Sequence, residues 1–170
     1  MADPELGWKV RRARREGDVE TLVAALQDET EASMAADFLG EMGASSAIPA
    51  LIPLMEAANP YQRASAVLSL EKLNAVNTCP WIMQIAEQDD VPWVRACATQ
   101  ALSGLPCDAQ ELLVRALDDS DIRVRRVAVE ALMKAGKSNA VSALVAARKR
   151  EHWFSRRIYS KAIRRLKRRS

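Results

Sequence analysis

The feature that most constrains the fold is a repeat of about thirty-one residues that runs through the sequence. One apolar series recurs at steps of 29, 31, 31 and 31 residues: Leu22, Leu51, Ile82, Leu113 and Leu144. A second series recurs at steps of 31, 32, 30 and 31 residues: Leu39, Leu70, Leu102, Leu132 and Ile163. Small and aliphatic residues lie four positions from most members, which is the spacing of one helical face. Each repeat therefore predicts two amphipathic helices, which bury their apolar faces by stacking on neighbouring pairs.

The two series predict ten helices, at residues 18–28, 31–42, 47–57, 61–74, 79–88, 92–104, 108–118, 122–135, 138–150 and 153–168. Pro60 and Pro92 stand where helices start, because proline is tolerated in the first helical turn. Gly43 and Gly104 stand where helices end. No segment shows the period-two alternation of a strand. We therefore expect an all-α fold, a right-handed solenoid of about five stacked helix pairs.

The length of 170 residues suits one domain, and a composition of 49% hydrophobic and 28% charged residues is ordinary for a folded chain. We expect an N-terminal capping segment at residues 1–17 and the repeats at residues 18–151. A basic C-terminal capping helix at residues 152–170 belongs to the same domain. Its apolar stripe of Phe154, Ile158, Ala162 and Leu166 is expected to pack on the preceding repeat.

Three segments carry a family pattern. Residues 119–132 read Asp-Ser-Asp-Ile-Arg-Val-Arg-Arg-Val-Ala-Val-Glu-Ala-Leu, and residues 89–98 read Asp-Asp-Val-Pro-Trp-Val-Arg-Ala-Cys-Ala. Together with residues 38–52, they resemble HEAT repeats, and more narrowly the bacterial HEAT-like repeats named after phycobilisome lyases. The resemblance implies an armadillo-like or HEAT-like α–α superhelix whose usual role is to offer interaction surfaces. It also implies a structural ladder that fixes the orientation of the repeats: Asp89, Arg95, Asp119 and Arg125.

The charges are unevenly distributed along the chain. Residues 16–120 carry 17 acidic and only four basic side chains, whereas residues 121–170 carry 16 basic and three acidic side chains. Such an asymmetry bears on the partners of a protein rather than on its fold. Because the first repeats and the last repeat are complementary in charge, we expect either a monomer or weak head-to-tail self-association.

The inner helices of the repeats predict an acidic concave face. Positions exposed beside the repeating Leu or Ile form a candidate partner-binding surface: Glu20, Glu56, Trp81, Gln84, Glu87, Glu111, Arg115 and Asp118. Trp81 is the expected anchor, because aromatic residues are enriched at binding hot spots. Our leading hypothesis is a non-enzymatic scaffold or adaptor that binds a protein partner, such as a basic segment, on this face. The alternative is that these carboxylates only keep the exposed face soluble.

The basic end of the chain supports a second hypothesis, a nucleic-acid-binding module. The residues that would bind phosphate or another anion are Arg123, Arg126, Arg148, Lys149, Arg157, Lys161, Arg164, Arg165 and Arg168. The alternative is a solvated cap that covers the last apolar face and binds nothing.

Catalysis is not expected. His152 is the single histidine, so the chain has no set of histidines for a metal site or a catalytic triad. We therefore expect no enzyme activity, cofactor or metal. Three cysteines without a paired spacing favour reduced thiols and a cytoplasmic location. No stretch approaches eighteen apolar residues, so no membrane span is expected.

Overall fold

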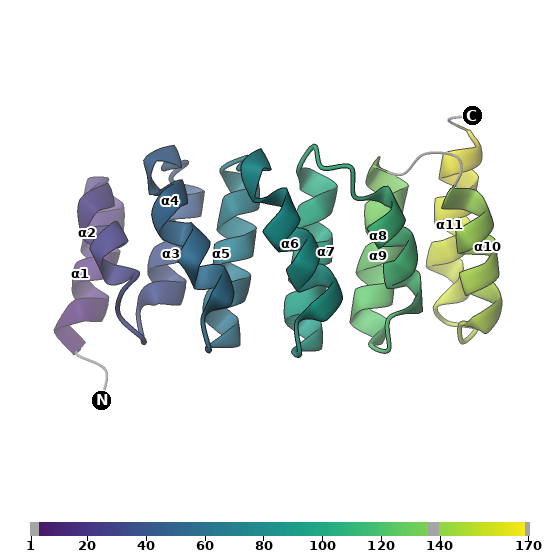
Figure 1. Ribbon diagram of the computed structural model, residues 1–170, viewed down its shortest axis with the longest axis horizontal. Helices are drawn as coiled ribbons and strands as arrows, with labels where there is room; N and C mark the ends of the chain where they lie inside the picture. The colour runs from purple at the N-terminus through teal and green to yellow at the C-terminus, as the bar shows by residue number, and fades with distance from the viewer. Residues whose placement is uncertain (1–3, 136–139, 169–170) are drawn as a thin grey trace. The chain divides into compact units, whose positions relative to one another are not determined.

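The computed structural model describes residues 4–135 and 140–168 (Figure 1). Every regular element in these two ranges is helical, so the all-α repeat fold expected from the sequence is confirmed. The chain divides into two compact units, Met1–Trp81 and Ile82–Ser170, which are described one at a time. All ten members of the two apolar series are buried, with exposed fractions between 0% and 7%. The periodicity therefore identified the core correctly.

The first unit consists of successive helices joined by short loops. They are α1 (Pro4–Glu16), α2 (Val19–Ala25), α3 (Ala32–Glu41), α4 (Ile48–Leu51), α5 (Pro60–Lys72) and the first turn of α6 (Cys79–Gln88). Short 3-10 helices precede or follow some of them: Ser45–Ala47, Ile52–Glu56 and Val76–Thr78. Helix α3 packs against α2 on one side and α5 on the other.

The helix predicted at residues 47–57 is broken in the structure. Only Ile48–Leu51 is α-helical, and Ile52–Glu56 continues as a 3-10 helix. Pro49 lies in the first turn, where its missing N–H is tolerated. Pro53 lies four residues further on, where it cannot donate to the carbonyl of Pro49 and its ring would clash with that carbonyl. The two prolines therefore account for the short α4.

Helix α1 was not predicted as a helix. Val10 and Ala13 are its buried apolar side chains among residues 7–16. Arg14 fastens it to α3: its Nη2 lies 2.7 Å from Glu41 Oε2, and its guanidinium lies 4.5 Å from the centre of the Phe38 ring. A helix with so narrow an apolar face gives a weak periodic signal.

The second unit is built from α7 (Pro92–Gly104), α8 (Gln110–Arg115), α9 (Ile122–Ala135), α10 (Ala140–Arg150), α11 (Arg156–Lys167) and the remainder of α6. A 3-10 turn, Ala116–Asp118, extends α8. Helices α7, α9 and α11 pack side by side in one layer (Figure 1). Helices α8 and α10 form the other layer and contact α9 and α11 respectively. This arrangement makes α9 and α11 neighbours.

The start of the last helix differs from the one expected from the sequence. Helix α11 begins at Arg156, not residue 153, so Phe154 lies in the preceding loop and is 70% exposed instead of packing on the previous repeat. The rest of the expected stripe is better placed, since Ala162 and Leu166 are fully buried.

The cysteines also differ from the expectation of reduced thiols. Both Cys79 and Cys107 are disulfide-bonded, whereas Cys97 is free and its burial raises its pKa.

Candidate binding groove

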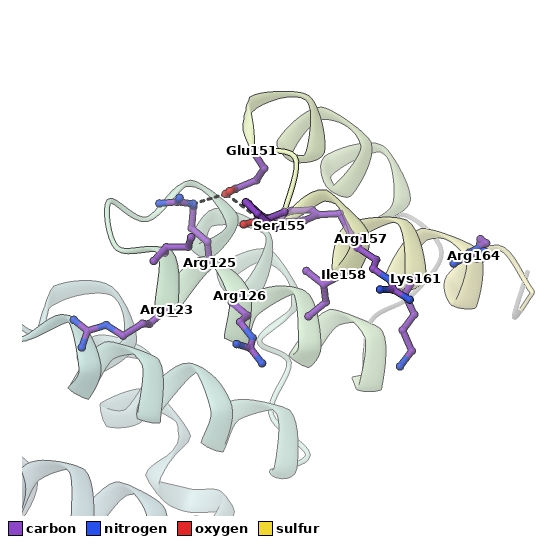
Figure 2. A pocket seen from close by; sticks show the side chains of 12 residues that line it. Arg123, Arg125, Arg126, Glu151, Ser155, Arg157, Ile158, Lys161 and Arg164 are labelled. Atoms are coloured by element: carbon purple, nitrogen blue, oxygen red, sulfur yellow. Dashed lines mark hydrogen bonds and ion pairs between the residues drawn. The ribbon is translucent and has the colours of Figure 1, made fainter.

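A hollow of about 800 Å³ lies between α9 and α11 (Figure 2). We call it the basic groove, because six of its lining side chains are basic and one is a carboxylate. Its lining residues are Ile122, Arg123, Arg125, Arg126, Glu151, Phe154, Ser155, Arg157, Ile158, Tyr159, Lys161 and Arg164. They come from the first half of α9, the loop before α11, and α11 itself. A volume of this size is within the range of small-ligand pockets.

The rim on the α11 side carries three exposed cations. Arg157, Lys161 and Arg164 follow each other at spacings of four and three, so they share one face of α11 (Figure 2). No ion pair involves these three side chains within the described part of the chain. Their charges are therefore available to an anion in the groove.

The rim on the α9 side is partly neutralised. The Nη2 of Arg123 lies 2.8 Å from Asp121 Oδ2, and the Nε of Arg126 lies 3.2 Å from Glu130 Oε1. Hydrogen bonds from Arg123, first from its side chain and then from its backbone N–H, lower the pKa of Asp121 to about 2. Asp121 is thus ionised at neutral pH. Both arginines remain exposed, but each is already paired with a carboxylate, so the rim cations without an ion pair in the described residues are those of α11.

Three apolar side chains, which we call the apolar floor, also line the groove: Ile122, Phe154 and Ile158. Ile122 is 53% exposed and Phe154 is 70% exposed, while Ile158 is half-buried between the rim cations of α11. The Phe154 ring is stacked on its own neighbours: its centre lies 3.5 Å from that of Trp153 and 5.7 Å from that of His152. The groove therefore combines a cationic rim with exposed apolar surface.

The groove is also lined by a buried carboxylate, that of Glu151. Glu151 Oε1 accepts hydrogen bonds from Arg125 Nε at 2.5 Å and from the Tyr159 hydroxyl at 3.3 Å (Figure 2). The backbone carbonyl of Glu151 accepts from Arg156 Nε at 2.9 Å. Burial, and then the charge of Glu151, raises the pKa of Tyr159 to about 12. Arg125 is held in place by this contact and forms part of the groove lining.

Tyr159 distinguishes α11 from the corresponding helices of the earlier repeats. The same position of the repeat is alanine at Ala66, Ala98 and Ala128. Tyr159 is 1% exposed, so its ring occupies the interface of α11. Tyr159 also lines the groove, so this repeat places a bulky aromatic ring where the earlier repeats have a methyl group. The groove therefore lies at the repeat in which this alanine is replaced.

The residues expected to form the ladder lie in contact within the second unit. Arg95 donates from Nε and Nη2 to the two carboxylate oxygens of Asp119, at 2.9 and 2.8 Å, and from Nη1 to the carbonyl of Asp89 at 2.8 Å. Arg125 repeats the pattern, donating to the carbonyl of Asp119 at 2.9 Å and to the side chain of Glu151. The sequence analysis did not identify Glu151 as a member of this ladder. Its spacing could have indicated this role, because it follows Asp119 by about one repeat.

The other expected anion-binding residues divide into two groups. Arg148 and Lys149 line a smaller hollow of about 310 Å³ between α10 and α11, together with Arg156 and Ser160. There Arg148 Nη1 donates to Ser160 Oγ at 3.2 Å. Arg165 on α11 and Arg168, the residue that caps the end of α11, are exposed and line neither of these two hollows. The residues predicted to bind anions therefore fall into three places: the basic groove, the smaller hollow, and the exposed C-terminal end of α11.

The acidic residues expected on the concave face are all exposed, and two of them are paired with arginines. In the first unit, Glu20 and Glu56 are exposed and Trp81 is 42% exposed. In the second unit, Gln84 and Glu111 are exposed.

Two carboxylates of that surface bind arginines of the same unit. Glu87 Oε1 accepts from Arg115 Nε at 2.9 Å, and Asp118 pairs with Arg150. Glu87, Arg115 and Asp118 also line one hollow of about 270 Å³. A basic partner would have to compete with Arg115 and Arg150 for these carboxylates. The pairing therefore weakens the acidic site in this unit.

Among the described residues, no group of three or more His, Cys, Asp or Glu side chains could hold a metal ion. None of the helices in the described ranges has the length and apolar character needed to cross a bilayer.

Comparison with known sequences decides the family. The sequence pattern of HEAT repeats matches residues 19–103 and again residues 80–164, and together these cover most of the chain. The chain belongs to the HEAT-repeat family. HEAT-repeat proteins commonly mediate protein interactions and are typically non-catalytic. The groove between α9 and α11 is thus a feature of the last two HEAT helix pairs of this chain.

Solved structures resemble this HEAT-repeat protein at low identity. A crystal structure of an engineered protein from a structural genomics consortium matches with a TM-score of 0.62 and 18% identity, covering 96% of this chain and 87% of that one. The complex of CpcE and CpcF of phycocyanin lyase from Nostoc sp. PCC7120 matches with a TM-score of 0.44 and 22% identity, covering 95% of this chain and 87% of that one. At these identities the first match supports the fold alone. No curated protein matches the sequence significantly.

Proposed function

We propose that this HEAT-repeat protein is a non-catalytic interaction module that binds an anionic segment of a partner protein in the basic groove. The observation that carries the proposal is the rim of Arg157, Lys161 and Arg164, three exposed cations on one helix face without ion pairs in the described residues. Like charges held on one face repel each other, and a bound carboxylate relieves that repulsion. The family supports the protein class of the partner.

The basic groove is favoured over the acidic surface for two reasons. First, Glu87 and Asp118 are already paired with Arg115 and Arg150, so a basic partner gains less there. Second, the groove offers apolar area beside its charges, and apolar burial contributes most of the free energy of protein association. Our leading expectation from the sequence was an acidic site that binds a basic segment, whereas the proposed site is basic and binds an acidic segment.

A nucleic acid is the second candidate partner. The supporting observation is the exposed aromatic pair beside the groove, since Trp153 is 64% and Phe154 is 70% exposed. Aromatic side chains next to arginines are the usual elements of single-strand binding, where bases stack on rings and phosphates contact cations.

Charge reversal on α11 tests the proposal. The test variant is Arg157→Glu/Lys161→Glu/Arg164→Glu, which reverses the groove rim. The matched control is Arg165→Glu/Lys167→Glu/Arg168→Glu, which makes the same change in net charge on exposed residues at the C-terminal end of α11 and its cap. None of these three residues lines either hollow. Labelled poly-glutamate and labelled single-stranded DNA are titrated with each protein and followed by fluorescence anisotropy.

We expect the rim variant to lose on the order of tenfold or more in affinity for poly-glutamate, because three favourable charge contacts become repulsive. The control variant loses less, since only the net charge changes. Equal losses in both variants would contradict a site in the groove. Preferential binding of DNA, with an affinity that falls by decades between about 50 and about 200 mM salt, would select the nucleic-acid candidate. Circular dichroism of each variant confirms that the helices are retained.

A further inference from the structure

The apolar side chains that line the basic groove restrict the kind of ligand that it can bind. Ile122 and Phe154 are large apolar side chains that are more than half exposed, and both lie in the same hollow as the cationic rim. Scattered apolar residues are normal on protein surfaces, but exposed apolar groups gathered in one concavity mark a binding site. Charges alone do not account for this floor.

The size of the groove excludes a single small anion as a sufficient occupant. A volume of about 800 Å³ is large enough for several side chains. A lone carboxylate or phosphate at the rim would leave Ile122 and Ile158 in contact with water. An occupant that contacts the whole lining carries both carboxylates and bulky apolar groups.

The rings beside the groove are poorly arranged for nucleic-acid bases. The Phe154 ring already stacks against Trp153 on one side, with centres 3.5 Å apart, and against His152, with centres 5.7 Å apart. A base would have to displace one of these neighbours to stack on Phe154. The remaining floor, Ile122 and Ile158, is aliphatic and has neither a planar face nor a hydrogen-bonding group for a base.

We infer that the basic groove takes an acidic peptide segment with bulky apolar side chains, whose apolar residues pack on Ile122, Phe154 and Ile158. The glutamates or aspartates that flank them lie against Arg157, Lys161 and Arg164. This inference rests on the proposed function, because it requires that the groove binds an anionic segment of a protein. It adds that apolar contacts, and not charge alone, select the partner.

The test uses two short glutamate-rich peptides that differ in two positions. The first carries two leucines one helical turn apart, and the second carries alanines in their place. Each is titrated with the wild-type protein, with Ile122→Ala/Phe154→Ala, and with the rim variant described above. Ile122 and Phe154 are exposed, so replacing them leaves the buried core unchanged. Phe154→Leu is included as the conservative variant that keeps an apolar floor.

We expect the leucine peptide to bind the wild-type protein about tenfold or more tightly than the alanine peptide, because burying one leucine is worth roughly one to two decades of affinity. We expect the Ile122→Ala/Phe154→Ala protein to bind the two peptides equally, and the Phe154→Leu protein to keep most of the preference for the leucine peptide. The alanine peptide binds the wild-type protein and the floor variant with similar affinity, since its contacts are with the rim.

Three outcomes separate this inference from the proposed function. Equal binding of the two peptides, abolished by the rim variant, would overturn the inference and leave the proposed function standing. An advantage of the leucine peptide that persists in Ile122→Ala/Phe154→Ala would place its apolar contact elsewhere and also overturn the inference. Binding of neither peptide, or binding that the rim variant does not weaken, would overturn both.

Discussion

Arg95 and Asp119 form a two-point ion pair, with Nε to Oδ2 at 2.9 Å and Nη2 to Oδ1 at 2.8 Å. Their side chains are only 12% and 13% exposed. The pair joins the start of α7 to the loop before α9, and Arg125 at the start of α9 makes the next contact of the same kind with Glu151. These contacts therefore link three consecutive helices of the layer that contains the basic groove.

Removing the Arg95 guanidinium is expected to destabilise the protein. Arg95→Met keeps the aliphatic stem but leaves Asp119 largely buried without its cation, which costs more than losing a surface pair and less than losing a fully buried one. We expect the free energy of unfolding to fall by about 2 kcal/mol. Urea denaturation measures the change. The control is Arg123→Met, whose pair with Asp121 is exposed and whose loss should have a small effect. Equal effects of the two substitutions would contradict a structural role for the Arg95 contact.

The same contact predicts a pH dependence. Burial alone would raise the pKa of Asp119, but the hydrogen bonds from Arg95 and from the backbone N–H of Asp121 outweigh it and leave the pKa below its usual value of 3.8. A carboxyl whose pKa is lowered by folding stabilises the folded state above its unfolded pKa, and this contribution is lost as the pH falls through the folded pKa. We therefore expect the stability of the wild-type protein to fall below about pH 4. In Asp119→Asn this part of the fall is absent. Unfolding curves of both proteins from neutral to acidic pH measure the difference, and parallel curves would contradict the shift.

The periodic part of the fold could be predicted from the sequence, because apolar spacing depends only on which residues face the core. Leu39, Leu70 and Leu102 are buried as expected. Local backbone chemistry was harder to predict. Pro53 ends α4 early, and α11 starts at Arg156 although the apolar pattern extends to Phe154. In such places the chain geometry overrides the periodicity.

The candidate site could be predicted only in part, since it depends on how two helices pack. The basic residues of α9 and α11 were visible in the composition, and five of the expected anion-binding residues line the groove: Arg123, Arg126, Arg157, Lys161 and Arg164. The apolar floor was not predicted. Phe154 was expected to be buried, and Tyr159, which takes the place of an alanine of the earlier repeats, also lines the groove. The internal pairing of Glu87 and Asp118 depends on cross-repeat distances that spacing does not give.

Tyr159 is expected to titrate later than an ordinary tyrosine. Burial, followed by the charge of Glu151, raises its pKa to about 12. A group whose pKa is raised by folding contributes stability that is complete below its unfolded pKa, near 10, and is lost as the pH rises toward 12. The chain has two tyrosines, so Tyr61→Phe leaves Tyr159 as the single reporter. We expect its phenolate absorbance in the ultraviolet to appear close to pH 12, and Tyr159→Phe to lack this phase.

Helicity is followed in parallel by circular dichroism, because alkaline unfolding would also expose the phenol. Ionisation of Tyr159 near its ordinary pKa, with the helical signal intact, would contradict the buried contact with Glu151. Tyr159→Phe should also lower the free energy of unfolding by about 1 kcal/mol, the usual loss for one hydrogen bond whose acceptor keeps another donor. The remaining donor here is Arg125.

Gly40 marks the closest approach of α3 and α5, and an alanine there is expected to be destabilising. A Cβ at Gly40 would lie 2.8 Å from the Cα of Ser69, which belongs to the backbone and cannot rotate away. The Ser69 hydroxyl also donates to the carbonyl of Ala36 at 2.8 Å, which fixes the two helices at this distance. Gly40→Ala should therefore lower the free energy of unfolding by about 1 to 3 kcal/mol, as overpacking usually does, although alanine is the better helix former. The matched control is Gly7→Ala in α1, where the nearest atom is the side-chain oxygen Oε1 of Glu31 at 3.1 Å, which can move. Urea denaturation of both variants should show a loss for Gly40→Ala and no loss for Gly7→Ala, and a Gly40→Ala protein as stable as the wild type would show that α3 and α5 can separate freely.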